Sequence, residues 1–342
     1  MRKIIKLMGI FTLILFVYLS FSSVVMYNKP GTGKRTDWSS LDYYVTFAFS
    51  KENEQFRIDK KGVTYVDYSK SKSLGVKNIT SYNPVIVGFQ GLRYYQDYKN
   101  THNNISFKRY LTHADWLVEN ISDDGSWYLT YDKNMGKYTL HSPWKSALSQ
   151  GFGISLLTRA YIDTGNQKYI NSARKALEPF SKYLDEDGVR SKNTFGEFYE
   201  EYPIKVHPTH VLNGFIYSLF GLYDLYIIDN NIEAKELFDE GIATLKKVLP
   251  EYDLGNWTRY NLDSERNLKN HWGYSSPRYQ KIHAAQLYGL HYITKDPYFR
   301  KYADKFEAQN RRSWINLVIY PAYILYRDFV AFYRFAMGKN MN

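Results

Sequence analysis

Residues 199–202, Tyr-Glu-Glu-Tyr, place two phenols and two carboxylates side by side in the chain. Pro203 follows them at once, and Pro208 comes shortly before an apolar helical pattern. Proline restricts the backbone and is tolerated at the start of a helix but not in its interior. Clustered ionisable groups on a rigid turn are more typical of a functional site than of a core. Phenols and carboxylates both suit proton transfer.

Four segments predict the elements that would position this turn. Each ends an apolar helix, passes a polar turn and begins a second, amphipathic helix: residues 91–98, 158–165, 221–228 and 289–296. Second helices are expected at residues 169–184, 233–249 and 298–309. A spacing of roughly 60–70 residues favours stacked helical hairpins over alternating βαβ units. The predicted fold is mainly α, an incomplete α/α toroid (α/α barrel) with first helices inside and second helices outside.

The segments that precede the four inner helices combine aromatic and polar residues with proline. They are residues 82–84, 142–145, 200–203 and 274–279, called the lead-ins below. In a toroid they would lie at the same end of the molecule, where helix N-termini favour anions. One interpretation is a shared cleft; the other is ordinary helix caps with packing aromatics.

The domain prediction divides the chain into four parts. Short alternating strands are expected at residues 43–49, 55–58 and 62–68, and a hairpin from strands at 126–131 and 137–141 around residues 134–136. The expected parts are a membrane anchor (1–30), a β-rich region (38–80), the helical catalytic domain (81–310) and a C-terminal tail (311–342).

An apolar run at residues 9–25 follows Arg2, Lys3 and Lys6. It is long enough for one crossing, and the positive-inside rule places the remainder on the non-cytoplasmic side of the membrane. An uncleaved signal anchor is preferred over a cleaved signal peptide, which would require a clearer small-residue cleavage site. The tail is expected either to pack on the body as a terminal helix or to lie at the membrane interface.

The composition limits the partners. The formal net charge is +11, with basic and acidic residues interspersed, so a nucleic-acid arm is not expected and a polyanionic substrate or anionic membrane fits better. Aromatic residues make up 18% of the chain, and their faces can stack on sugar rings. The absence of cysteine excludes disulfides, zinc thiolates and a thiol nucleophile. The sequence does not fix the oligomeric state, and a homo-oligomer is compatible with it.

Over residues 82–309 the chain resembles the D-glucuronyl C5-epimerase family. The matching runs are Trp-Lys-Ser-Ala-Leu-Ser-Gln-Gly (144–151), Tyr-Glu-Glu-Tyr-Pro (199–203), Leu-Asn-Gly-Phe (212–215), Leu-Pro-Glu-Tyr-Asp-Leu-Gly (249–255) and Tyr-Gln-Lys-Ile-His-Ala-Ala-Gln-Leu (279–287). The resemblance implies a membrane-anchored isomerase of heparan sulfate biosynthesis that converts glucuronate to iduronate in a heparan-type polysaccharide. It implies no diffusible cofactor.

The resemblance also implies site residues. Tyr202, Tyr260 and Tyr279 match catalytic tyrosines, Glu201 matches an active-site carboxylate, and Asn213 matches a sugar contact. The family has an arginine where this chain has Asp263, which removes a cation expected to hold the substrate. Arg259 and Arg278 are candidate substitutes. Tyr274 competes with Tyr279 for the same role, because the segment before Tyr279 departs from the family.

Epimerisation at C5 removes a proton next to a carboxylate and returns one from the opposite face. It needs a group that offsets negative charge and two groups that give and take protons. Tyrosine suits the second need if a nearby cation lowers its pKa from about 10. The candidate cations are Lys145, Lys205, Arg259, Arg278, Lys281 and His283. Glu201 would either hydrogen-bond the substrate carboxylate or orient a base.

Trp144 and Gln150 each have two interpretations. Trp144 is either a sugar-stacking platform or a buried aromatic, and Gln150 is either a substrate contact or a satisfied core amide. Tyr82, in the first lead-in, and His283 are expected substrate contacts. The His-Pro-Thr-His run at 207–210 suits loop hydrogen bonding better than a metal, because no acidic third ligand lies at a diagnostic offset.

Two rival functions remain open. A polysaccharide lyase would abstract the same C5 proton and then expel the 4-O substituent, forming an unsaturated uronate that absorbs in the near ultraviolet. A non-catalytic glycan-binding protein would keep its function without the phenol hydroxyls, provided that the aromatic rings remain.

Overall fold

The computed structural model describes residues 55–68, 80–135, 138–263 and 274–311. The predicted membrane run at 9–25, the predicted strand at 43–49 and nearly all of the predicted tail lie outside these ranges. Within them, none of the helices combines the length and the apolar character that crossing a bilayer requires. The predicted domain boundaries stay predictions.

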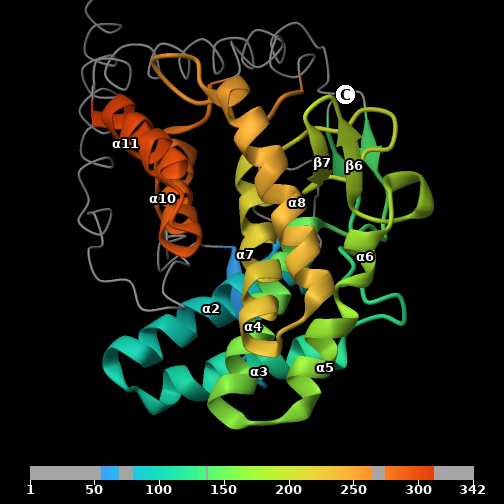
Figure 1. Ribbon diagram of the computed structural model, residues 1–342. Coiled ribbons are helices and arrows are strands. Elements are labelled where there is room, and N and C mark those ends of the chain that lie inside the picture. Colours follow the sequence, from blue (N-terminus) through green and yellow to red (C-terminus); the bar gives the residue numbers. More distant parts are fainter. Residues whose placement is uncertain (1–54, 69–79, 136–137, 264–273, 312–342) are drawn as a thin grey trace, which may run out of the picture.

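Four helical hairpins form most of the described fold (Figure 1). The first helices are α2 (Pro84–Thr101), α4 (Ala147–Thr164), α7 (Leu212–Asp229) and α10 (Pro277–Thr294). The second helices are α3 (Asn104–Glu119), α5 (Gln167–Lys175), α8 (Ile232–Val248) and α11 (Pro297–Arg311). The predicted mainly helical fold and its helix–turn–helix repeat are confirmed.

The same two-residue turn joins the helices of each hairpin. A residue with positive φ ends the first helix: His102, Gly165, Asn230 and Lys295. An Asn or Asp follows, and its side-chain oxygen accepts a hydrogen bond from the start of the second helix: Asn103, Asn166, Asn231 and Asp296. A left-handed residue stops the first helix and an Asx cap starts the next, so local chemistry alone sets these turns.

The first helices pack side by side. Helix α4 lies against α2 on one side and α7 on the other, and α7 also contacts α10. Helices α4 and α7 approach closely at Gly151 and Gly221: a Cβ on Gly151 would lie 2.6 Å from the backbone oxygen of Tyr217. The second helices are amphipathic instead, as α8 buries Leu237, Gly241 and other residues at helical spacing on one face. The row of first helices therefore forms the core.

A buried ion pair joins α4 to α7. Arg159 Nη1 lies 2.6 Å from Asp224 Oδ2, and neither side chain is exposed to solvent. Arg159 also donates to the backbone oxygen of Ser155, while its Nε has no partner among the described residues. Removing one partner of such a pair leaves an uncompensated charge in the core.

We therefore expect Asp224→Asn to lower the free energy of unfolding by about 3–5 kcal/mol, because Arg159 would stay charged and buried. Asp229→Asn is the matched control: it also lies on α7 and also pairs with an arginine, Arg174, whose side chain is 48% exposed. Its expected cost is below about 1 kcal/mol. Urea titrations of both variants check the difference, and equal costs would contradict it.

Three small antiparallel sheets accompany the helices. The first pairs β1 (Phe56–Ile58), β2 (Thr64–Asp67) and β3 (Thr80–Ser81), which confirms the predicted strands at 55–58 and 62–68. The second pairs β4 (Lys133–Asn134) with β5 (Thr139–Leu140). The third pairs β6 (Arg190–Asn193) with β7 (Gly196–Tyr199). The hairpin predicted around residue 135 is present, but its first strand starts at Lys133 rather than at 126.

The predicted second helix at 169–184 is wrong in its length. Helix α5 ends at Lys175, and a short α6 (Glu178–Ser181) and a 3₁₀ turn, η2 (Leu184–Glu186), follow. Pro179 explains the break, because it has no N–H to donate and its ring clashes with the carbonyl four residues earlier.

Candidate active site

The Glu-Glu-Tyr-Pro lead-in (200–203) follows strand β7 and is held against the start of α4. Ala147 N donates to the backbone oxygen of Glu200 at 3.0 Å, and Ser146 Oγ donates to that of Glu201 at 2.7 Å. The backbone of both glutamates is thereby fixed, so their side chains have defined and different surroundings.

Glu200 is a structural carboxylate. It is fully buried, accepts from Ser191 Oγ at 2.7 Å and from the backbone N of His210 at 3.0 Å, and lies 2.6 Å from the His210 ring. It ties β6 to the loop before α7. One of the two adjacent carboxylates thus serves the fold.

Glu201 faces the start of α7 instead. Its Oε2 lies 3.5 Å from Asn213 Nδ2. A Cβ on Gly214 would lie 2.6 Å from the same oxygen, so a glycine there leaves room for the carboxylate. Asn213 Oδ1 is buried and has no hydrogen-bond donor among the described residues.

Two phenols contact Glu201 and a third packs on one of them, and we call Tyr202, Tyr260 and Tyr279 the phenol cluster. Tyr260 donates from its hydroxyl to Glu201 Oε1 at 3.4 Å, and the rings of Tyr260 and Tyr279 lie 4.6 Å apart. Tyr202 interacts through its hydroxyl with Glu201 and Tyr260. The structure therefore brings together the three tyrosines and the glutamate that the sequence named as catalytic.

The surroundings keep two of these phenols, Tyr202 and Tyr260, protonated. Burial, and then the negative charge of Glu201, raise the pKa values of Tyr202 and Tyr260 well above the usual value of 10. The sequence analysis made the role of these tyrosines depend on a lowered pKa, and the pKa values of Tyr202 and Tyr260 are raised instead. In the substrate-free site Tyr202 and Tyr260 therefore carry their protons.

Contacts link the first three lead-ins, and Tyr131 connects the first of them to the second. Asn83 Nδ2 lies 3.0 Å from the Tyr131 hydroxyl, the rings of Tyr131 and Trp144 are 5.9 Å apart, and Trp144 lies 6.1 Å from Tyr202. Trp144 is buried, and its indole N–H donates to the backbone oxygen of Tyr131. Of the two interpretations of Trp144, a sugar-stacking platform or a buried aromatic, these contacts match the second, and the ring packs on Tyr202.

Gln150 is a core amide, which corrects the predicted substrate contact. It is fully buried, and its amide bonds the backbone N of Trp127 and the backbone oxygens of Gly125 and Ala176. No polar atom of the side chain remains to meet a sugar. Tyr82 donates to Asp59 at 2.8 Å and stacks on a tryptophan of α3, so its predicted substrate contact stays a prediction.

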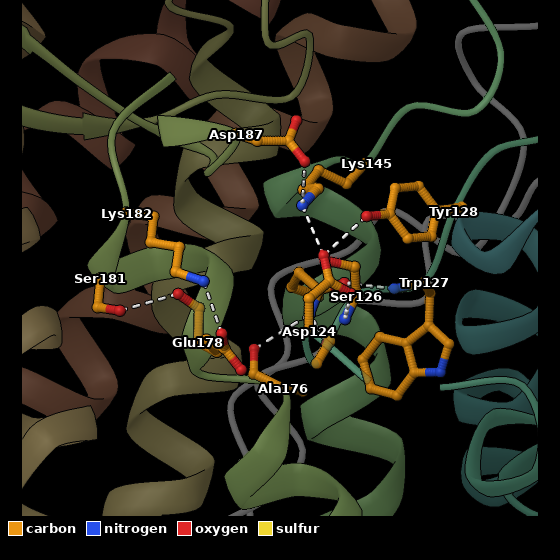
Figure 2. Close-up of polar contacts among 12 residues, drawn as sticks. Asp124, Ser126, Trp127, Tyr128, Lys145, Ala176, Glu178, Ser181, Lys182 and Asp187 are labelled. Carbon is orange, nitrogen blue, oxygen red and sulfur yellow. Dashed lines mark hydrogen bonds and ion pairs between the residues drawn. The ribbon is translucent and has the colours of Figure 1, made fainter. Parts of the chain in front are cut away.

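Lys145 is engaged away from the phenol cluster, which corrects its prediction as a cation for the tyrosines. Figure 2 shows its ammonium between two carboxylates, 2.8 Å from Asp124 and 3.1 Å from Asp187. Burial disfavours its charge, but the hydrogen bonds to both carboxylates outweigh it and raise the pKa of Lys145. The cluster joins the start of α4 to the loops around residues 124 and 187.

His283 cannot supply positive charge either, which corrects that prediction. The ring is fully buried, its Nδ1 lies 2.9 Å from Thr258 Oγ1, and its Nε2 has no partner among the described residues. Burial lowers the pKa of His283 to about 3. The imidazole is therefore neutral at physiological pH, and it supports the α10 side of the site without contacting solvent.

This burial makes stability depend on pH. The folded-state pKa of His283 lies below the ordinary value of 6.5, so the unfolded state binds more protons and stability falls as pH decreases from about 6.5 towards 3. We expect the free energy of unfolding to fall by about 1.4 kcal/mol per pH unit from this residue. Urea titrations from pH 7 to 4.5 measure the slope, and His283→Gln should reduce it. His113, whose pKa burial lowers to about 4, adds to the same pH dependence, and His283→Gln leaves that contribution in place.

The two histidines of the His-Pro-Thr-His run bind separate carboxylates. His207 Nε2 lies 2.8 Å from Asp263, whereas His210 pairs with Glu200. Among the described residues, no three His, Asp or Glu side chains converge in the manner of a metal site. Loop hydrogen bonding, the preferred interpretation of this run, is what the contacts show.

The arginine candidates flank the site in sequence. Arg259 forms a β-bridge with Tyr274, and Arg278 is exposed in the first turn of α10. Asn256 Nδ2 lies 3.4 Å from the Tyr274 hydroxyl, whereas Tyr279 contacts Tyr260 directly. These contacts group Tyr279, not Tyr274, with the other two phenols. The substrate-binding roles of both arginines stay predictions.

Sequence reasoning missed Lys133. Its ammonium lies 4.8 Å from the centroid of the Tyr202 ring. No local signal marks it, because Lys133 belongs to the β4–β5 hairpin, and the helices α4 to α6 and the strands β6 and β7 separate it from Tyr202 in the chain.

Comparisons with known proteins place the chain in a family. Residues 121–308 match the family model described as D-glucuronyl C5-epimerase C-terminus. The chain is 39% identical over 214 residues to a D-glucuronyl C5-epimerase of Caenorhabditis elegans, covering 56% of this chain and 33% of that protein. It is 30% identical over 179 residues to an uncharacterized protein of Methanocaldococcus jannaschii, covering 51% and 55%. The chain thus spans about one third and about half of these relatives.

The fold is also similar to two solved structures, at TM-scores too low to define it. One is a GH76 α-mannanase of Bacteroides thetaiotaomicron (TM-score 0.49, 9% identity, covering 88% of this chain and 72% of that one). The other is a cellobiose 2-epimerase of Bacillus thermoamylovorans (TM-score 0.45, 11% identity, covering 66% and 58%). The family match, which spans more than half of the chain, carries the assignment: this protein belongs to the D-glucuronyl C5-epimerase C-terminal family.

Proposed function

We propose that this protein is a polysaccharide-modifying C5-epimerase that converts D-glucuronate to L-iduronate in a heparosan- or heparan-type glycan. The observation that carries the proposal is the contact of Glu201 with Tyr202 and Tyr260, with Tyr279 packed on Tyr260, in a chain of this family. The net charge of +11 suits an acidic polymer.

Glu201 suits the role of a proton relay, because it contacts the hydroxyls of Tyr202 and Tyr260. In the first step the C5–H bond breaks, its proton passes to one phenol oxygen, and that phenol gives its own proton to the Glu201 carboxylate. The electron pair of the C–H bond enters the enolate formed with the substrate carboxylate.

In the second step the opposite phenol donates its proton to the other face of C5. Glu201 then returns its proton to this second phenol, and all three groups regain their starting states. Neutral phenols with raised pKa values suit this scheme, since both must carry a proton at the outset. Tyr202 is one of the two phenols, and Tyr260 or Tyr279 is the other.

The proposal extends to architecture and location. The row of first helices would form the inner layer of an incomplete α/α toroid, with the lead-ins at one end. The N-terminal apolar run would anchor a single-pass protein whose catalytic domain lies on the non-cytoplasmic side.

The test is incubation of the full chain with heparosan, and separately with other uronate polymers, in heavy water, followed by NMR. Deuterium at C5 together with iduronate signals is the expected result. An unsaturated uronate absorbing in the near ultraviolet would replace the proposal with a lyase. Binding of a polymer without exchange at C5 would replace it with a glycan-binding function.

A further inference from the structure

The phenol cluster needs a cation, and two of the residues predicted for this role, Lys145 and His283, do not supply it. Removing a proton next to a carboxylate creates a second negative charge, which a nearby positive group must offset. Glu201 adds negative charge to the phenol cluster. Burial is the largest cause of the raised pKa values of Tyr202 and Tyr260, and the charge of Glu201 is the next. A site of this composition would oppose the reaction unless a cation lies beside it.

The position expected to hold that cation carries the opposite charge. Asp263 stands where the family resemblance expects an arginine, and its carboxylate is engaged by His207 at 2.8 Å. Lys145 is held by Asp124 and Asp187, and His283 is neutral. The two predicted cations Lys145 and His283 therefore do not offset charge at the phenol cluster, and Asp263 carries the opposite charge.

The β4–β5 hairpin supplies a cation from another part of the chain. Lys133 lies in β4, opposite Leu140 of β5, and its ammonium is 4.8 Å from the centroid of the Tyr202 ring. Leu140, Ile204 and Trp144 belong to one buried cluster against which Tyr202 packs. The hairpin is thus anchored beside Tyr202 by apolar contacts that do not depend on the charge of Lys133.

A second contact fixes the hairpin over the same loop. The ring of Tyr138 stacks on His207, with centroids 5.5 Å apart and planes inclined by 19°. Lys133 and Tyr138 therefore meet the loop at residues 202 and 207, one on each arm of the hairpin. Two attachment points therefore hold the hairpin that carries Lys133 against the loop of Tyr202.

We propose that Lys133 is a further catalytic residue, the cation that stabilises the negative charge of the hexuronate carboxylate and of the enolate formed beside Tyr202. The inference rests on the proposed function and deepens it: Lys133 replaces, from the β4–β5 hairpin, the positive charge that Asp263 does not provide. It would also select acidic sugars over neutral hexoses, which lack the carboxylate.

The experiment compares Lys133→Met, which keeps the length of the side chain but not its charge, with Lys133→Arg, which keeps the charge. Deuterium exchange at C5 of heparosan is followed by NMR from pH 5.5 to 9. We expect Lys133→Met to lower kcat 10- to 100-fold and to move the acidic limb of the kcat profile to higher pH, because losing a positive charge favours protonated forms. Lys133→Arg should recover much of the rate.

Lys235→Met is the matched control, since Lys235 is an exposed lysine of α8 that pairs with Asp239. It should leave kcat and the pH profile unchanged. Thermal unfolding verifies folding of each variant, and Lys133→Gln replaces Lys133→Met should the latter not fold. A kcat within twofold of wild type with an unchanged profile would overturn the role of Lys133. Absence of exchange by the wild type on every polymer would instead overturn the proposed function, and this inference with it.

Discussion

Tyr202→Phe is expected to lower kcat for C5 exchange by about two to four orders of magnitude, the range over which general acid–base groups contribute. The substitution keeps the ring that packs on Trp144 and below Lys133 and removes only the hydroxyl that interacts with Glu201 and Tyr260. The affinity for heparosan should change little, because the aromatic surface is retained. Deuterium incorporation at C5 and equilibrium binding of the polymer measure the two effects separately.

Three other tyrosine substitutions serve as a control and as a comparison for Tyr202→Phe. Tyr169→Phe removes a hydroxyl that donates to Asp115 between α5 and α3, and should leave exchange unchanged. Tyr274→Phe and Tyr279→Phe distinguish the two competitors, and the contact of Tyr279 with Tyr260 leads us to expect the larger loss from Tyr279→Phe. A Tyr202→Phe variant with more than a tenth of the wild-type rate would contradict the assignment of Tyr202.

The helical hairpins were predictable because their signals are local. The left-handed residue and the Asx cap of each turn lie next to each other in sequence, and the apolar helix before them and the amphipathic helix after them differ in pattern. The break after α5 was missed, although Pro179 gives a local reason for it. The extent of the β4–β5 hairpin also differed, since strand ends depend on pairing rather than on composition.

The family motifs identified the residues of the site, but the sequence could not predict the properties that depend on burial and on distant partners. The family runs identified Tyr202, Tyr260, Tyr279 and Glu201, which the fold brings together. Composition alone could not distinguish Glu201 from its neighbour Glu200, because both are acidic and adjacent, and only the family resemblance singled out Glu201.

Charge assignments failed for a related reason. A lysine or histidine near a motif looks like a cation for the site until its partners are known. Lys145 has two carboxylate partners from distant loops, and the His283 side chain is fully buried. Lys133, which does lie beside Tyr202, is brought there by tertiary packing of the β4–β5 hairpin, through Leu140 on Trp144 and through Tyr138 on His207.

Glu201→Gln tests the relay and should lower kcat about 10²- to 10³-fold. Glutamine keeps the size of the side chain and can still accept a hydrogen bond from Tyr260, but it cannot take up the proton that a phenol releases. Exchange at C5 should therefore be lost while the fold is kept, and the midpoint of thermal unfolding should stay within a few degrees of wild type. NMR exchange rates and thermal unfolding of the same preparation measure both quantities.

Glu200→Gln is the matched control, because the same substitution one residue earlier meets a different environment. Glu200 is fully buried and bonds Ser191, the backbone N of His210 and the His210 ring. The Glu200→Gln variant should therefore lose about 1–3 kcal/mol of its free energy of unfolding, with a smaller loss of kcat in the protein that stays folded. Opposite outcomes for the two neighbours would separate proton transfer from folding. If Glu201→Gln lost stability and kept its rate, Glu201 would support the loop, and the phenols would have to exchange protons without it.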